Sequence, residues 1–203
     1  MTMKKKTIIA IAAFALVCAG AAAQSAAAEH YEIGDKGPGG GIVFYYSEAG
    51  FPVQDSDDAS PVICHYLECA PEEVGSIPWC PCGHKMWCHI RTTDDLGAGK
   101  LNTVHIVDGT HDAPLTSSNC AAYACAHYGT KTTKAGEWYL PSKLELHLLY
   151  ENFRKSGKIA SDAWHWSSSQ YRYNVAWCQR FSDSQQDYDG KFGSGCVRAV
   201  RAF

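Results

Sequence analysis

The sequence predicts an α+β fold, with two helices in the second half of the chain between strand segments near its ends. The first observation is a β-branched and aromatic run at 42–46, which is typical of a buried strand. The second is the alternation at 197–203, where Arg198 and Arg201 divide apolar residues. The third is two helix patterns at 117–129 and 142–157. With 203 residues, 46% of them hydrophobic, the chain fits one globular domain.

The N-terminal segment predicts export. Lys4, Lys5 and Lys6 precede an uncharged stretch at 7–28 whose second half is rich in Ala, the layout of a secretory signal peptide over 1–28. An uncleaved membrane anchor stays open because the uncharged run is nearly long enough to span a bilayer. A lipoprotein signal at Cys18 is a third option, although Val17 stands where a small residue is usual. Either option would attach the protein to a membrane through its N-terminus.

Charge and cysteine content narrow the class of protein. A formal net charge of -3 argues against nucleic acid as a partner. Ten cysteines in an exported chain favour disulfides, whose pairing the sequence leaves open. The segment 51–90 is rich in Pro, Asp and Cys and has no helix or strand periodicity. We therefore interpret residues from about 52 to 90 as an insertion within a domain at 29–203, held by its own cysteines.

Each helix has its own boundary signals. The first, at 117–129, has Ser117, Ser118 or Asn119 as a cap and ends at Gly129. The second begins with Ser142 and Glu145 at capping-box spacing and ends at Gly157. Its predicted core positions are Leu144, Leu148, Leu149 and Phe153.

The glycine-rich stretch at 97–103 resembles a phosphate-binding loop only superficially. Leu101 follows the lysine where such loops carry Ser or Thr. We expect a turn there, followed at 104–107 by a short strand or the start of a helix.

No constellation in the sequence predicts catalysis. The run Ser167, Ser168 and Ser169 has no neighbouring His or carboxylate, so hydrogen bonding within a strand and turn is expected. Cys178 and Cys196 lack a neighbouring base. We therefore predict no catalytic residue and no cofactor.

Two groups of residues contain metal-ligating types, but their spacing does not match that of known metal sites. A zinc site would use Cys80, Cys82, His84, Cys88 and His89, but the first pair is too tight and disulfides compete. A calcium loop would use Asp183, Asp187 and Asp189 before Gly190, without the alternation and final Glu of such loops. Calcium or zinc stays open without support.

The C-terminal tail has the composition of a binding surface. Between the frames at 164–169 and 197–203 it is rich in Tyr, Ser, Gly, Asp, Arg and Asn. Aromatic rings give contact area at low entropic cost, and small polar residues adapt their hydrogen bonds. A plain solvated loop has a similar composition and stays open as an alternative.

Four motifs together resemble a known bacterial family. They are IGDKGPGGGIVFYY at 33–46, GAGKLNT at 97–103, WYLPSKLEL at 138–146, and WSSS at 166–169 with the terminal VRAVRAF. In that family the C-terminal domain has the C-type lectin-like fold of the formylglycine-generating-enzyme (sulfatase-modifying) subtype. The resemblance implies two helices, a twisted and mainly antiparallel sheet, and first and last strands that pair near each other. It does not imply sugar binding or formylglycine synthesis, because neither motif is matched.

The tail is also similar to the treponemal variable proteins, whose gene ends are rewritten by diversity-generating retroelements through adenine-directed mutagenesis. Mutated Asn codons can yield Tyr, Ser, Asp, Gly, Cys, Phe, Arg or Val, but never Gln, Lys, Trp, Glu or Met. Between Tyr171 and Cys196 the residues of the inaccessible types are Trp177, Gln179, Gln185, Gln186 and Lys191, spaced as a fixed frame.

The resemblance implies a cell-surface, outer-membrane-associated or periplasmic protein that binds a protein or other cell-surface ligand through a variable region at about 170–196. The predicted ligand-binding residues are Arg172, Tyr173, Asn174, Val175, Cys178, Arg180, Asp183, Asp187, Tyr188, Asp189, Phe192, Ser194 and Cys196. Of these we expect Tyr173, Arg180, Asp187, Tyr188 and Phe192 to share one exposed face. Two alternatives stay open, an oxidase of the formylglycine-generating kind and a structural envelope protein.

Overall fold

The computed structural model describes residues 30–81, 88–156 and 162–203. The predicted signal segment 1–28 with Cys18, and Gly157 at the expected helix end, lie outside these ranges. The chain divides after His30, and the described helices and strands all belong to the unit Tyr31–Phe203. None of the helices in the described ranges is both long enough and apolar enough for a membrane span.

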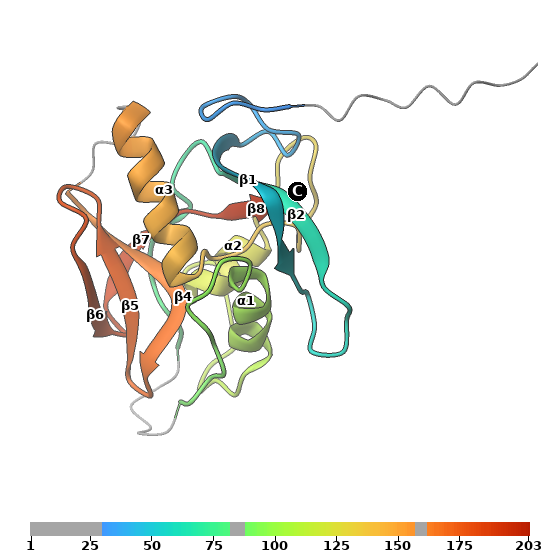
Figure 1. Cartoon of the computed structure of the whole chain (residues 1–203). Helices are drawn as coiled ribbons and strands as arrows, with labels where there is room; N and C mark the ends of the chain where they lie inside the picture. The colour runs from blue at the N-terminus through green and yellow to red at the C-terminus, as the bar shows by residue number, and fades with distance from the viewer. Residues whose placement is uncertain (1–29, 82–87, 157–161) are drawn as a thin grey trace, which may run out of the picture. The chain divides into compact units, whose positions relative to one another are not determined.

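The described residues form an α+β fold with three helices and two sheets (Figure 1). One sheet has the order β1-β2-β8, and the other, which is mixed, has the order β3-β7-β4-β5-β6. The strands are β1 Ile42–Val53, β2 Val62–Cys69, β3 Gly75–Pro78, β4 Trp164–Arg172, β5 Val175–Arg180, β6 Gln186–Gly190, β7 Ser194–Val197 and β8 Val200–Ala202. The helices are α1 Gly99–Asp108, α2 Ala121–Ala126 and α3 Lys143–Ser156.

The Cys-rich segment is part of both sheets, which corrects its interpretation as an insertion with little core. Strand β2 lies between β1 and β8 and pairs with both, so the first and last strands do not pair with each other. Strand β3 pairs with β7. The segment 66–70 is buried at every position, and a strand buried on both faces has no polar–apolar alternation to find in the sequence.

Helix α3 confirms the capping box and corrects one core position. The Ser142 backbone N–H donates to Glu145 Oε2 at 2.7 Å, and the Glu145 N–H donates to Ser142 Oγ at 3.2 Å. The helix buries Leu146, Leu149, Tyr150 and Phe153. Leu144 is 40% exposed because the buried stripe runs through 146, 149, 150 and 153, which leaves position 144 off that face.

The other two helices differ from the expected ones. Helix α2 is shorter than the predicted 117–129 and is capped by Cys120, whose Sγ accepts from the Tyr123 N–H, instead of by residues 117–119. Helix α1 develops from the segment for which a strand or a helix start stayed open. Its N-terminus has no side-chain cap, which explains why no start signal is visible in the sequence.

The C-terminal frame is two strands instead of one. Strand β7 lies in the five-stranded sheet, and β8 crosses to the three-stranded sheet, where Val200 also forms a bridge with Tyr139. Both Val197 and Val200 are fully buried. The tail that contains β5 and β6 is therefore fastened at its end to both sheets.

Candidate ligand-binding surface

Strands β4, β5 and β6 form two consecutive antiparallel hairpins at one edge of the five-stranded sheet (Figure 1). Tyr173 and Asn174 make the turn of the first hairpin. Strand β6 is the edge strand, and helix α3 lies against β4 and β5. One end of the sheet face is thus covered by α3 while the hairpin turns remain exposed.

An aromatic cluster lies on the same face of the sheet as α3, beside the start of that helix. Trp177 on β5 is the cross-strand partner of Tyr188 on β6, with ring centroids 5.9 Å apart. Tyr171 on β4 lies 4.9 Å from Trp177, edge to face, and stacks on Tyr188 at 4.3 Å. We call Tyr171, Trp177 and Tyr188 the aromatic face. Tyr171 is 38% exposed and Tyr188 47% exposed, so the cluster presents ring surface to solvent.

Two cations adjoin the aromatic face. The Lys143 Nζ lies 3.3 Å from the centroid of the Trp177 ring, and the Arg172 guanidinium lies 5.2 Å from that of Tyr171. Both distances are within the range of cation–π attraction. Lys143 is the first residue of α3, so the helix start that the capping box fixes also positions this cation. Sequence patterns did not indicate Lys143 as a site residue because it lies far from the tail along the chain.

The expectation of one shared face is wrong for Asp187 and for Arg180. Arg180 pairs with Trp164 and, three residues after Trp177, points to the opposite face of β5. Successive residues of a strand point to opposite faces, so Asp187 and Asp189 lie opposite Tyr188. Their cross-strand partners are the buried Cys178 and Ala176. Each carboxylate accepts the next residue's backbone N–H, at 2.8 Å for Asp187 and 2.6 Å for Asp189. The tail therefore has an aromatic face and, on its other side, an acidic edge.

Arg180 and Asp183 hold each other instead of facing solvent freely. Arg180 Nε donates to Asp183 Oδ1 at 2.9 Å, and a second guanidinium nitrogen donates to Gln185 Oε1 at 2.7 Å. The hydrogen bond from Arg180 lowers the pKa of Asp183 below its usual range. In the same turn Ser184 has a φ of 67°, a left-handed conformation that a side chain rarely adopts. The pair stiffens the β5–β6 turn.

The two tail cysteines do not lie on the exposed surface. Cys178 is only 6% exposed, and burial raises the pKa of its thiol to about 12. Cys196 is half-buried, and burial raises the pKa of its thiol to about 11. A protonated thiol is a poor nucleophile, so neither residue has the character of a catalytic thiolate at neutral pH. Cys178 is therefore not a ligand-contact residue, because its side chain faces the core.

The other predicted residues differ in how far they face solvent. Val175 and Asp187 are half-buried, as is Arg180. Apart from Asp183, which Arg180 holds, the exposed members of the set are Arg172, Tyr173, Asn174, Tyr188, Asp189, Phe192 and Ser194. We call these seven residues the exposed tail set.

Residues of the inaccessible codon types anchor the tail from inside. Gln179 is fully buried, and its Nε2 lies 3.2 Å from His147 Nδ1 on α3. Lys191 is 1% exposed, and its Nζ donates to Gln170 Oε1 at 2.6 Å and to the Cys88 carbonyl at 3.0 Å. Gln186 donates to Gln179 Oε1 at 3.3 Å, and only Gln185 of this group is exposed.

The serine run is structural, as the sequence predicts. All three hydroxyls are buried. Ser167 Oγ donates to the Trp177 carbonyl at 2.9 Å, Asn102 Nδ2 donates to Ser168 Oγ at 3.1 Å, and Ser169 Oγ donates to the Thr93 carbonyl at 2.9 Å. These bonds tie β4 to β5, to α1 and to the segment before α1, and so they support the candidate surface.

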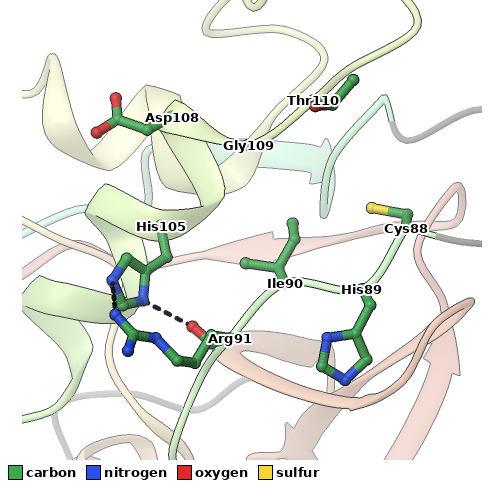
Figure 2. Close-up of a pocket in the computed structure, with 8 residues that line it drawn as sticks. All are labelled: Cys88, His89, Ile90, Arg91, His105, Asp108, Gly109 and Thr110. Atoms are coloured by element: carbon green, nitrogen blue, oxygen red, sulfur yellow. Dashed lines mark hydrogen bonds between the residues drawn. The ribbon is translucent and has the colours of Figure 1, made fainter.

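A pocket of about 380 Å³ adjoins the group at 80–89 for which a zinc site stayed open without support (Figure 2). Cys88 and His89 line it, whereas Cys82 and His84 lie outside the described residues. Across the pocket the Arg91 guanidinium lies 3.1 Å from His105 Nε2, and His105 Nδ1 donates to the Arg91 carbonyl at 2.7 Å. The His105 ring is thus engaged by Arg91 through both nitrogens.

Comparison with known proteins leaves the family open. No model of a known protein family matches the chain, and no curated protein matches it either. The geometry of the exposed tail set and the aromatic face is therefore the basis for a functional conclusion.

Proposed function

We propose that this protein is an exported, cell-surface ligand-binding protein of the C-type lectin-like fold, whose C-terminal segment is diversified by a retroelement. The ligand would be a protein or another cell-surface molecule. It would contact the exposed tail set together with the aromatic face. The sequence resemblance supplies the finer fold, the formylglycine-generating-enzyme subtype, and the observed architecture supports the coarser α+β class.

One observation carries the proposal: in the tail, most residues of the inaccessible codon types are buried or half-buried, although Cys178 and Phe181, of accessible types, are buried too. The residues that adenine-directed mutation of Asn codons cannot reach are mostly anchors, including the buried Gln179 and Lys191 and the half-buried Trp177 and Gln186. Every member of the exposed tail set is of a type that such mutation reaches. A diversification mechanism that spares the anchors could change the surface without unfolding the domain, because loops held by a rigid scaffold tolerate such change.

The chemistry of the surface suits recognition of varied partners. Tyr171 and Tyr188 supply rigid ring area, and Arg172 adds a charged group that can also stack. Binding energy at protein interfaces concentrates in Trp, Tyr and Arg residues. We therefore expect Tyr188 and Arg172 to contribute most, with Asn174 and Ser194 adapting hydrogen bonds at the rim. The basic start and uncharged run at 4–28 support an exported location.

The proposal is tested first on the gene. Many copies of its 3′ end, taken from one population of the source, should differ in codons of the exposed tail set. The same copies should be invariant at Gln179 and Lys191. Exposed residues outside the tail, such as Glu48 and Lys131, are a matched control and should also be invariant. Differences spread evenly over tail and control positions would contradict the proposal and favour a structural envelope protein.

A second test looks for the partner directly. A photo-crosslinking phenylalanine analogue replaces Tyr188 in one variant and the exposed Lys131 in a control variant. Each variant is incubated with intact cells from the environment of the source organism. The Tyr188 variant should form a discrete crosslinked product that the Lys131 variant lacks. Equal products from both variants would show that the tail has no special role. Turnover of a thiol-containing peptide by the unmodified protein would instead favour the oxidase alternative.

A further inference from the structure

Three side chains with metal-binding atoms lie close together, and none of them belongs to the exposed tail set. They are Glu73 from the β2–β3 connection, His165 on β4 and Cys196 on β7, and their ligand atoms all lie within 4.8 Å of one another. In the ranges 30–81, 88–156 and 162–203 they are the one such group of three His, Cys, Asp or Glu residues. His165 is fully buried, whereas Glu73 and Cys196 are half-buried, so the group is open to solvent on one side.

The backbone itself sets two of the three ligands side by side. Strands β4 and β7 pair in parallel, and the registered pair of that ladder is His165 with Cys196. The preceding Gly195 lies against the Trp166 ring, where a Cβ would come within 2.7 Å of Nε1, so the register cannot shift easily. The two side chains are therefore presented from adjoining positions of a rigid sheet.

Glu73 is held in place from both sides. The Val74 N–H donates to the Val197 carbonyl, and the Ala70 N–H donates to the Ala199 carbonyl, each at 2.8 Å. Between them Arg198 Nη1 donates to the carbonyls of Ala70 and Pro71, each at 2.9 Å. The connection that contains Glu73 is thus pinned to the end of β7, which pre-organises its carboxylate beside Cys196.

The surroundings of the His165 ring indicate what the group can bind. Nδ1 lies 3.2 Å from the Ala163 carbonyl, and Nε2 lies 2.8 Å from Glu73 Oε1. A neutral imidazole has one N–H, so it can donate to only one of these acceptors. If Nδ1 donates to the carbonyl, the Nε2 lone pair faces a carboxylate, and a cation between them relieves the repulsion. A backbone carbonyl on the second ring nitrogen is also the usual orienting contact of a metal-bound histidine.

We propose that Glu73, His165 and Cys196 form a binding site for a zinc-like divalent transition metal. Thiolate, imidazole and carboxylate are the three ligand types that zinc combines in proteins. Thiolate and carboxylate together neutralise the two positive charges of the ion, and solvent or a ligand group takes the fourth position on the open side. Tetrahedral zinc holds its ligand atoms roughly 3.3–3.8 Å apart, so the group needs to close by about 1 Å at its widest.

Arg198 is expected to lower the metal affinity of the site. Its guanidinium lies 3.6 Å from the same Glu73 oxygen that His165 approaches. A cation at that distance opposes the metal ion electrostatically, so we expect weaker binding than at a site of four cysteines. The competing arrangement is a metal-free ion pair in which a doubly protonated His165 donates to Glu73, with Arg198 adding to it.

The site is tested by titrating the full-length, reduced protein with Co²⁺, which reports thiolate ligation by a charge-transfer absorption band. The parent should take up an ion with this band. Cys196→Ser should lose one equivalent and the part of the band that belongs to it. Cys178→Ser removes a buried thiol of the same tail outside the group and should behave like the parent. This control separates the site from the other cysteines of the chain.

A second variant distinguishes loss of metal binding from loss of folding. Glu73→Gln changes a half-exposed side chain without changing its size, and should weaken Co²⁺ and Zn²⁺ binding at least about tenfold with an unchanged near-ultraviolet circular dichroism spectrum. Zn²⁺ should raise the melting temperature of the parent more than that of Glu73→Gln. The proposal is overturned if the parent shows no thiolate band, if Cys196→Ser keeps the full band, or if Glu73→Gln binds as tightly as the parent.

Discussion

Tyr171 and Tyr188 stack with ring centroids 4.3 Å apart and planes 18° apart, although their strands are not hydrogen-bonded to each other. Strand β5 lies between β4 and β6, and the two rings meet over its Trp177. The contact therefore fixes the relative position of the two hairpins. It also creates a continuous ring surface that no pair of neighbouring strands would supply alone.

The first prediction concerns this contact. A double-mutant cycle with Tyr171→Ala and Tyr188→Ala should give a coupling free energy of about 0.5–1.5 kcal/mol, the usual size for an aromatic pair. The measurement is urea unfolding of the parent, both single variants and the double variant. Tyr171→Ala with Val62→Ala, an exposed position on β2 of the other sheet, serves as the comparison cycle. Strictly additive effects in the Tyr171–Tyr188 cycle would show that the two hairpins are energetically independent.

The second prediction is that the exposed part of the tail can be rewritten. Replacing Arg172, Asn174, Asp189 and Ser194 together with Ala should change the free energy of unfolding little, since exposed substitutions each contribute within about 0.5 kcal/mol. Arg180 is left intact because it holds the β5–β6 turn. Thermal melts of the variant and parent measure the effect.

The matched control for that variant is a single change at an anchor. Gln179→Ala should destabilise by about 1–3 kcal/mol, because it leaves half-buried polar atoms of His147 and Ser184 without their hydrogen bonds. If the fourfold surface variant melts lower than Gln179→Ala, the tail residues are part of the packed structure and the division into surface and anchors is wrong.

The third prediction separates two glycines of the tail. A Cβ at Gly195 would lie 2.7 Å from Trp166 Nε1, whereas a Cβ at Gly190 has no atom within 4 Å. Trp166 is 2% exposed and donates from Nε1 to the Ile77 carbonyl, so the indole cannot withdraw without losing that bond. Gly195→Ala should cost about 1–3 kcal/mol by overpacking.

Gly190→Ala is the control, since it makes the same chemical change in open space and should leave the free energy of unfolding within about 0.5 kcal/mol. Denaturant unfolding of both variants decides the matter. If Gly195→Ala has the same free energy of unfolding as the parent, β7 can move away from Trp166, and the pairing register of β7 with β4 is not rigid.

The fourth prediction is a pH dependence of stability from Glu145. Burial raises the pKa of this carboxyl to about 7 from a usual value of 4.5. Between these two values the folded protein holds a proton that the unfolded chain has released, so unfolding becomes easier as pH rises. The contribution of Glu145 is fully present below pH 4.5 and is lost by about pH 7, and it amounts to about 3 kcal/mol.

Glu145→Gln isolates that contribution, because glutamine cannot ionise. Its single oxygen can accept from only one of the Gly97 and Ser142 N–H groups, which lowers the stability of the variant at every pH. Free energies of unfolding from pH 4 to pH 8 should fall more steeply for the parent than for the variant. Parallel curves for the two proteins would indicate that Glu145 stays ionised in the folded state, held by those two N–H donors.

Local chemistry alone determined several features of this protein. The α+β class follows from apolar periodicity, and the start of α3 follows from the Ser142–Glu145 capping box, because caps and periodicity act over a few residues. The structural role of Ser167, Ser168 and Ser169 follows from the lack of a neighbouring base. The set of exposed tail residues was also largely visible, since a segment without persistent apolar runs cannot be buried throughout.

Tertiary structure decided what depends on pairing between distant segments. The second half of strand β2, 66–69, has no alternation to reveal it, because both its faces are buried, and its pairing with β1 and β8 depends on distant segments. The opposite facing of Asp187 and Tyr188 required knowledge that 186–190 is a strand, since in a loop both could face one way. Lys143 reached Trp177, and Glu73 reached His165, only through the fold. Neither contact has a sequence signal, because the chain between the partners sets no distance until the sheets form.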